Sequence, residues 1–377
     1  MNDYSNIPSS ILNKLHLKLH TVQNHPLCII KNVIYEYFKT LPEFENFTTH
    51  DNLSNIVSTT SNFDDLLIGP DHPSRKKSDT YYLNETTVLR SQTSAHQCEL
   101  MRKSEKSFLV TGDVYRKDEI DKCHYNIFHQ MEGVKILENT THADIEFAEM
   151  TLKNVLMKLL NYLFPSCEYR FNTDYFPFTE PSFEVEVKYE GKWLEILGCG
   201  VIHRTILNNL GIHEIGFAFG FGLERIAMIL FKINDIRLFW TNSPKFSNQF
   251  DSNIDFRLIK FKPFSKLDSI HKDISFYIHM DQIYLTNDNT FEWSMLNDFN
   301  DIVRDVCGDS IENVSILDKY FNKKINKYSH TFRLTFSPNS DITNSADFSN
   351  LANEYMNKLG TVLLEKINLE PRFLITK

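Results

Sequence analysis

The spacing of apolar positions in the first part of the chain predicts helices and a pair of strands. Between Asn24 and Phe38, and again between Leu152 and Leu163, apolar residues recur at the period of one helical face. Pro165 ends the second of these helices. Phe108–Val114 is apolar enough for a strand, and Tyr125–Val134 is its expected antiparallel partner across a charged turn.

A second pattern, strict alternation, predicts further strands. From Phe183 to Tyr189 every second residue is apolar and the residues between are charged. Gly191 then turns the chain into another strand, Trp193–Leu197, and Gly216–Gly222 leads into a helix. Because these strands meet through short turns, we predict an α+β fold, with a mainly antiparallel sheet flanked by helices.

The pattern lapses after Trp240 into a polar stretch, and a second unit follows. Its predicted elements come in the order strand, helix, strand, strand, helix, strand, which is the ferredoxin-like β-α-β-β-α-β order. They are Ile274–His279, Phe291–Val306, Val314–Tyr320, Tyr328–Phe336, Phe348–Lys366 and Pro371–Thr376. We therefore expect a first domain at 1–240 that includes an N-terminal helical extension, a linker at 241–265 and a ferredoxin-like domain at 266–377.

Composition narrows the class of protein. The formal net charge of −9 argues against electrostatic binding of nucleic acid by the surface as a whole, but it is compatible with a local basic patch. The six cysteines include no C-x-x-C pair, which fits reduced thiols in the cytosol or an organelle matrix. No apolar run approaches the roughly 20 residues that span a bilayer, so we expect no membrane contact. Met1–Ser10 is neither an apolar signal peptide nor an Arg-rich transit peptide.

The predicted hairpin at 108–133 gathers side chains suited to a charged, aromatic ligand. Arg116 closes its first strand, and His124 lies at the start of the second. Side chains alternate along a strand, so Phe128, Gln130 and Glu132 share one face. An aromatic ring, an amide and a carboxylate would then line one surface opposite an arginine. A solvated hairpin whose polar positions face water is the alternative interpretation.

Two further passages carry candidate binding residues. The glycines at 216–222 would let a ligand approach the backbone just before a helix whose N-terminus, together with Arg225, favours anions. Phe176 and Phe178 flank a proline and could grip another ring. Simple close packing is the alternative for both passages. Glu195 lies between apolar neighbours, so a buried carboxylate there would need a cation, a metal or a hydrogen-bond donor.

Other common sites are not indicated. The glycine spacing is not the G-x-G-x-x-G of dinucleotide-binding proteins. The sequence also has neither H-E-x-x-H nor paired C-x-x-C spacing for a metal, nor a G-x-S-x-G nucleophile elbow.

Together these passages resemble motifs 2 and 3 and the pocket segments of class II aminoacyl-tRNA synthetases, and within that class the phenylalanyl-tRNA synthetases. The resemblance is carried by GPDHPSR, DTYY, TSAHQ, HYNIFHQMEG, FPFTEPSFEVEV, KWLEILGCG and GFAFGFGLERIAM, between about His25 and Phe250. KDISF (272–276) and GDSIENVSILDKY (308–320) resemble the anticodon-binding domain of the single-chain organellar form. The implied fold is the class II antiparallel sheet with a C-terminal ferredoxin-like domain.

The resemblance implies a reaction and its substrates. L-phenylalanine would be activated with ATP and Mg²⁺ to phenylalanyl-adenylate plus pyrophosphate, and then transferred to the 3′-terminal ribose of tRNA(Phe). The family's organellar members work as monomers, so a monomer in the mitochondrial matrix is implied.

The resemblance also implies a role for each site residue. Arg116 would hold the α-phosphate and Arg225 the γ-phosphate, and together with His124 near the phosphates they would be the catalytic residues. Phe128 would stack on adenine beside Tyr125, and Glu195 would face the nucleotide or its magnesium. The amino acid would be bound by Ser94, Gln97, Gln130 and Glu132 at its polar end, with Ala95 and His96 in the same motif, and by Phe176, Phe178, Ala218, Phe219 and Gly220 around its ring.

One departure from the family pattern concerns the substrate carboxylate. Where the family reads Thr-His-Thr-Ser, this chain has Ser91-Gln92-Thr93-Ser94. Glutamine can donate a hydrogen bond but carries no charge, so we expect weaker positioning of the substrate rather than loss of activity.

For tRNA, basic residues gather about the turn between the middle strands of the C-terminal domain. They are Lys319, Lys323, Lys324, Lys327 and Arg333. We expect part of the tRNA backbone to contact them, and a solvated turn is the alternative.

Two rival functions stay open at this point. The first is a class II ligase that activates a different acid, against which the FPF segment and Ala218 speak. The second is a non-catalytic tRNA-binding paralogue, whose expected mark is loss of Arg116, Arg225 or Glu132. All three are present.

Overall fold

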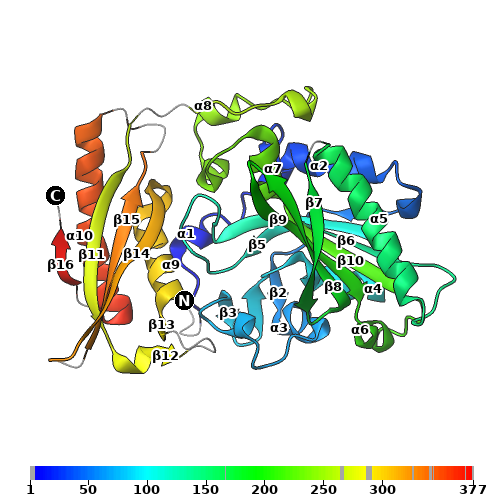
Figure 1. Ribbon diagram of the computed structural model, residues 1–377, viewed down its shortest axis with the longest axis horizontal. Helices are drawn as coiled ribbons and strands as arrows, with labels where there is room; N and C mark the ends of the chain where they lie inside the picture. The colour runs from blue at the N-terminus through cyan, green and yellow to red at the C-terminus, as the bar shows by residue number, and fades with distance from the viewer. Residues whose placement is uncertain are drawn as a thin grey trace.

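The computed structural model describes residues 5–165, 167–263, 267–285, 291–324, 327–338, 342, 344–369 and 371–375. Two main sheets organise it, one of seven strands and one of four. In Figure 1 the larger N-terminal unit, blue to green, lies beside the C-terminal unit, yellow to red, and α1 (Ser9–Leu12) lies between them. The described residues contain no helix that is both long enough and apolar enough to cross a membrane.

The seven-stranded sheet confirms the predicted antiparallel architecture. Its order is β1-β5-β6-β10-β9-β8-β7, and every pairing is antiparallel except that of β1 with β5. In that order the strands are Thr48–His50, Ser107–Tyr115, Ile127–Ile136, Gly216–Gly222, Lys192–Ile202, Thr179–Tyr189 and Tyr169–Phe176. The glycine-rich passage is therefore a central strand that pairs on both sides, while the edge strands β1 and β7 were not predicted.

Helices cover one face of this sheet and bury its larger core. They are α2 (Pro26–Phe38), α5 (Ile145–Leu163) and α7 (Leu223–Phe231). Because side chains alternate along β10, Phe217, Phe219 and Phe221 join this core, whereas Ala218 belongs to a separate cluster on the other face.

Smaller elements cover that other face. They are α3 (Thr59–Asn62), α4 (Gln97–Arg102), α6 (Arg204–Asn209) and a three-stranded sheet of β2 (Ile56–Ser58), β4 (Thr87–Leu89) and β3 (Tyr82–Asn84). This small sheet lies in a polar stretch without apolar periodicity and was not predicted.

The C-terminal unit has the predicted ferredoxin-like order. Its sheet runs β14 (Ile311–Asn322), β15 (Lys327–Phe336), β11 (Ile270–Ile278), β16 (Pro371–Ile375), with helices α9 (Leu296–Cys307) and α10 (Ser345–Ile367). The helix predicted to begin at Phe291 begins at Leu296 instead. Phe291–Trp293 is β13, which pairs with β12 (Ile283–Leu285) in a hairpin that the prediction missed.

The stretch expected as a linker, 241–265, is folded as far as it is described. It contains α8 (Pro244–Ser247) and a 3₁₀ turn, η7 (Phe256–Leu258). The side chains of Phe246, Phe250 and Phe261 are buried in the larger core. This part of the chain therefore packs on the N-terminal unit, and positions 264 and 265 lie outside the described residues.

The C-terminal unit contacts the loop that joins β5 to β6. Lys117 lies 2.6 Å from Asp298 of α9, and Arg304 donates to the carbonyl oxygen of Asp118 at 2.9 Å. This loop follows Arg116 directly, so the C-terminal unit borders the candidate site.

Candidate active site

A cavity of about 680 Å³ brings most of the predicted site residues together. It opens on the sheet face opposite α5, over β6, β9 and β10. Among its lining residues are Ser94, Arg116, His124, Tyr125, Phe128, Gln130, Glu132, Phe176, Phe178, Glu195, Ala218, Phe219, Gly220 and Arg225. Gln92, at the departure from the family pattern, also lines it.

At one end of the cavity, two guanidinium groups are each held by a backbone carbonyl. Arg116 donates from Nε to the oxygen of Ser91 at 2.7 Å, and its guanidinium carbon lies 5.4 Å from the centre of the Phe128 ring. Arg225 donates from Nη1 to the oxygen of Glu195 at 2.6 Å. A guanidinium carries five N–H donors, so donors of both arginines remain for an anionic ligand.

Glu195 lies at this end, but the expectation that it is buried was wrong. Its side chain is 54% exposed and its Oε2 lies 3.4 Å from Nη1 of Arg225. The apolar residues on either side, Leu194 and Ile196, point to the opposite face of β9 by strand alternation. Glu184 lies on β8, the strand next to β9, and its pKa is raised. Partial burial is the main cause, and the nearby charges of Glu195 and Glu186 add to it.

His124 and Tyr125 border the same end from the loop before β6. The ring Nδ1 of His124 lies 2.8 Å from Oδ2 of Asp121, and this hydrogen bond raises the pKa of His124. Tyr125 lines the cavity, yet its hydroxyl donates to Asp309 of the C-terminal unit at 2.7 Å. Its hydroxyl is therefore committed to the contact between the units.

The other end of the cavity holds a buried carboxylate. Glu132 is 2% exposed, and neither of its carboxylate oxygens accepts a hydrogen bond from the described residues. Burial raises its pKa to about 7, while the neighbouring hydroxyls of Ser94 and Thr93 act in the opposite direction. Gln130, two residues earlier on the same face, accepts from the backbone N–H of Thr93 at 3.2 Å. An unpartnered buried carboxylate beside a cavity fits a cationic ligand group.

Two aromatic rings line the same cavity as this carboxylate. The rings of Phe176 and Phe178 stack with centroids 5.9 Å apart and planes at 18°. Gly198 leaves room for Phe176, because a Cβ there would come within 2.9 Å of its ring. Ala218 is 5% exposed on the same face. The ring of Phe219 instead stacks on Phe38 in the core at 5.6 Å, so its side chain does not shape the pocket floor.

The structure does not bring three predicted residues to the cavity wall. Ala95 packs in a small apolar cluster with Phe63 and Val88. His96 is buried, and its Nε2 lies 3.0 Å from the carbonyl oxygen of Ser54. Gln97 is buried at the start of α4, and neither amide atom has a partner among the described residues. The 3₁₀ turn at Thr93–His96 rotates these side chains away from the cavity.

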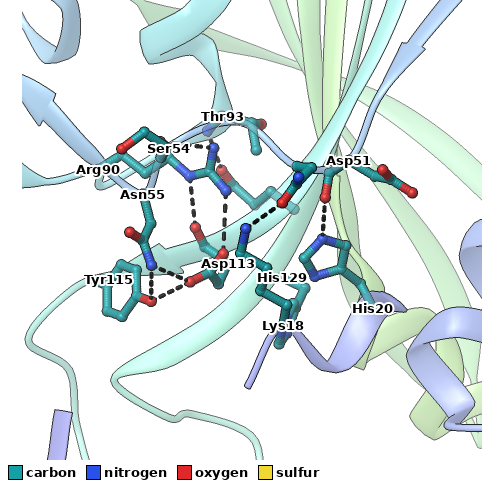
Figure 2. A network of polar contacts seen from close by, with 12 residues as sticks. Lys18, His20, Asp51, Ser54, Asn55, Arg90, Thr93, Asp113, Tyr115 and His129 are labelled. Carbon is teal, nitrogen blue, oxygen red and sulfur yellow. Dashed lines mark hydrogen bonds and ion pairs between the residues drawn. The ribbon is translucent and has the colours of Figure 1, made fainter. Parts of the chain in front are cut away.

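A buried network behind the site was missed from the sequence. Arg90, 1% exposed, donates from Nε to the carbonyl oxygen of Asp113 at 2.8 Å, and its Nη2 lies 3.3 Å from Oδ1. Asn55 donates to the other carboxylate oxygen at 2.9 Å, as Figure 2 shows. Arg90 directly precedes Ser91, so the network fixes the carbonyl that holds Arg116. The sequence signals were Asp113 within the largely apolar strand β5 and Arg90 directly after β4.

The chain is similar to known proteins over most of its length. The sequence model of the family "tRNA synthetases class II core domain (F)" matches residues 13–250. The chain is 43% identical to the chloroplastic/mitochondrial phenylalanine–tRNA ligase of Arabidopsis thaliana, across 98% of this chain and 83% of that protein.

Two mitochondrial phenylalanine–tRNA ligases match over similar lengths. Identity to that of Mus musculus is 40%, across 89% of this chain and 79% of the other. Identity to that of Dictyostelium discoideum is 39%, across 96% and 87%. The chain therefore belongs to the class II aminoacyl-tRNA synthetases and, within them, to the phenylalanine–tRNA ligases.

Proposed function

We propose that this chain activates L-phenylalanine with ATP and transfers it to tRNA(Phe) in the mitochondrial matrix, as a monomer. One observation carries the proposal. A single cavity has two guanidinium groups at one end and, at the other, an unpartnered buried carboxylate beside two stacked phenylalanine rings. These features match the two substrates that have to meet for amino-acid activation.

At the nucleotide end, Arg116 and Arg225 would bind the phosphates, and Phe128 under Arg116 would stack on the adenine. The carboxylate of phenylalanine attacks the α-phosphorus and pyrophosphate leaves. The step needs alignment and stabilisation of developing negative charge, so no protein nucleophile or base is required. His124, whose pKa is raised by its hydrogen bond to Asp121, would add positive charge near the phosphates.

The residues at the nucleotide end fit a magnesium ion that is held by one protein carboxylate rather than by several. Glu195 faces the cavity, and the described residues contain no cluster of three or more His, Cys, Asp or Glu side chains arranged for a metal. Mg²⁺ is typically held by one or two carboxylates plus substrate phosphates and water. Bound there, it would neutralise phosphate charge, with Glu195 as its protein ligand.

At the amino-acid end, Glu132 would pair with the substrate ammonium, with Gln130 and Ser94 beside it. Phe176 and Phe178 would hold the phenyl ring in the space that Ala218 and Gly220 leave. The polar contacts would therefore select an α-amino acid, and the apolar wall would select its side chain.

For tRNA, we propose a contact at the β14–β15 hairpin. Lys319, Lys323, Lys324 and Lys327 are exposed there, whereas Arg333 forms two 2.9 Å contacts with Asp273 and is already paired. Replacing Lys323 and Lys324 by alanine should flatten the salt dependence of tRNA binding by about 0.7–0.9 per lost phosphate contact. An unchanged slope would place the contact elsewhere.

ATP–pyrophosphate exchange with each of the twenty amino acids tests the central proposal. Phenylalanine should support exchange, and tyrosine should be about a hundredfold worse, since an apolar pocket rejects an added hydroxyl only weakly. Exchange with a different amino acid would show a ligase for another acid, and no exchange at all would favour a non-catalytic tRNA-binding protein.

A further inference from the structure

A buried histidine–carboxylate pair joins the two structural elements that carry the proposed nucleotide-binding residues. His129 lies in β6 between Phe128 and Gln130, and Glu224 directly precedes Arg225 in the first turn of α7. The ring Nδ1 of His129 lies 2.7 Å from Oε1 of Glu224. The backbone N–H of His129 donates to both carboxylate oxygens, at 3.1 and 2.9 Å. The side chains are 0% and 3% exposed.

The pair lies where the β6–β10 ladder stops. Gly222, the last residue of β10, is paired with Gln130, and the chain then turns into α7. The carboxylate of Glu224 accepts the backbone N–H of His129 beyond that last pair, where no strand residue of β10 remains to do so. The first turn of α7 is thereby fixed against β6 at one point.

The surroundings of His129 define which ring nitrogen carries the proton. Its ring packs against His20 and Trp240, with centroids 5.2 and 5.8 Å away, and Figure 2 shows His129 beside His20. Its Nε2 has no partner among the described residues. A carboxylate can only accept, so Nδ1 carries the proton that is shared with Glu224.

We propose that His129 and Glu224 are positioning residues for Arg225. Arg225 is adjacent in sequence to Glu224, so a shift or rotation of the first turn of α7 would move its guanidinium relative to Arg116 and Phe128. Glu224 itself reaches the cavity wall, although it is nearly fully covered. The inference rests on the proposed phosphate-binding role of Arg225.

Two variants of one histidine test this geometry. The amide nitrogen of asparagine lies near the position of Nδ1, whereas that of glutamine lies near Nε2. His129→Asn should therefore keep the hydrogen bond to Glu224, and His129→Gln should lose it. We expect His129→Gln to lower kcat/KM for ATP in pyrophosphate exchange about tenfold, while the Kd for phenylalanine measured without ATP changes less than about twofold. His129→Asn should stay within about threefold of the wild type.

Thermal unfolding of both His129 variants shows whether each still folds. The activity of Arg225→Ala tests the phosphate-binding role on which the inference rests. Equal ATP defects in the two variants, or parallel losses of ATP and phenylalanine binding, would show a purely structural role and overturn the inference. If Arg225→Ala leaves kcat/KM for ATP unchanged, the proposed role of Arg225 fails instead. A large defect in Arg225→Ala together with wild-type behaviour of His129→Gln would overturn the inference alone.

Discussion

The two ends of the cavity hold their charges in opposite ways. At the nucleotide end, Arg116 is exposed at the surface and Arg225 is half-buried, and each is already held by a backbone carbonyl. At the amino-acid end, Glu132 is 2% exposed and has no hydrogen-bond partner among the described residues. Each cation is held by the protein before any ligand binds, whereas the buried carboxylate has no cationic partner until a ligand supplies one. We infer that the nucleotide end mainly sets the rate of amino-acid activation and that the amino-acid end mainly sets the selectivity for phenylalanine.

Removing a cation from the nucleotide end should have the largest effect. Arg116→Ala should lower the rate of pyrophosphate exchange about 10²–10³-fold, because charge that develops on the phosphate loses a preorganised donor. Saturating ATP should not restore the rate. Arg102→Ala is a matched control, since Arg102 is 54% exposed and pairs with Asp65. A loss of less than about fivefold in Arg116→Ala would remove Arg116 from the chemistry.

At the amino-acid end, Glu132→Gln should weaken the binding of phenylalanine and, as a separate effect, change the stability of the ligand-free protein. Loss of the charge should raise KM for phenylalanine about 10–100-fold, as expected for a buried charge-assisted contact. The KM for ATP should change little.

The same variant has a pH signature. The pKa of Glu132 is raised from 4.5 to about 7, so its contribution to stability is complete below pH 4.5 and is lost as the pH rises through 7. In the absence of phenylalanine, the free energy of unfolding of Glu132→Gln should therefore exceed that of the wild type at pH 8, by up to about 3 kcal/mol, and should equal it at pH 4.5. Glu146→Gln, an exposed change, is the control. Identical pH profiles for Glu132→Gln and wild type would contradict the burial account.

Selectivity at the buried end should respond to one methyl group. Ala218→Gly should widen the pocket and improve exchange with para-substituted phenylalanines by about 10-fold or more relative to phenylalanine. Ala227→Gly removes a methyl group from a fully buried alanine of α7 and serves as the control. Unchanged selectivity in Ala218→Gly would refute its place at the ring.

The smallest effect is expected at Gln92, which lies at the cavity wall. Among the described residues, its Nε2 has one hydrogen-bond partner, the carbonyl oxygen of Asn62 at 3.4 Å. Gln92→His, which restores the family residue, should leave the activation rate unchanged or raise it up to about threefold. A large loss in a pyrophosphate-exchange assay would show that this chain has adapted to glutamine.

Much of the fold could be predicted because burial enforces periodicity. The alternation in β8 and the leucine face of α5 both follow from one side packing against the core. Prediction failed where elements are short or polar, as in β1 and the three-stranded sheet. It also failed at Phe291–Trp293, where a strand of three residues is too short to show a period, and at Phe246 and Phe250, whose irregular spacing concealed a packed segment.

The site could be predicted as a set of residues but not as directions of side chains. Apolar neighbours suggested that Glu195 is buried, although strand alternation places it on the opposite face from them. His96 lies in the same motif as Ser94, yet the 3₁₀ turn points it at the carbonyl oxygen of Ser54. Contacts between distant segments, such as Arg90 with Asp113 and His129 with Glu224, leave no local pattern to detect.

The claim that one cavity holds both substrates is tested most directly with a non-hydrolysable phenylalanyl-adenylate analogue. Isothermal titration of the wild-type chain should show one site per chain, and in exchange assays the analogue should compete with both ATP and phenylalanine. Arg116→Ala and Glu132→Gln should each weaken its binding. Competition with only one substrate, or binding that neither variant affects, would contradict a shared cavity with these two charged ends.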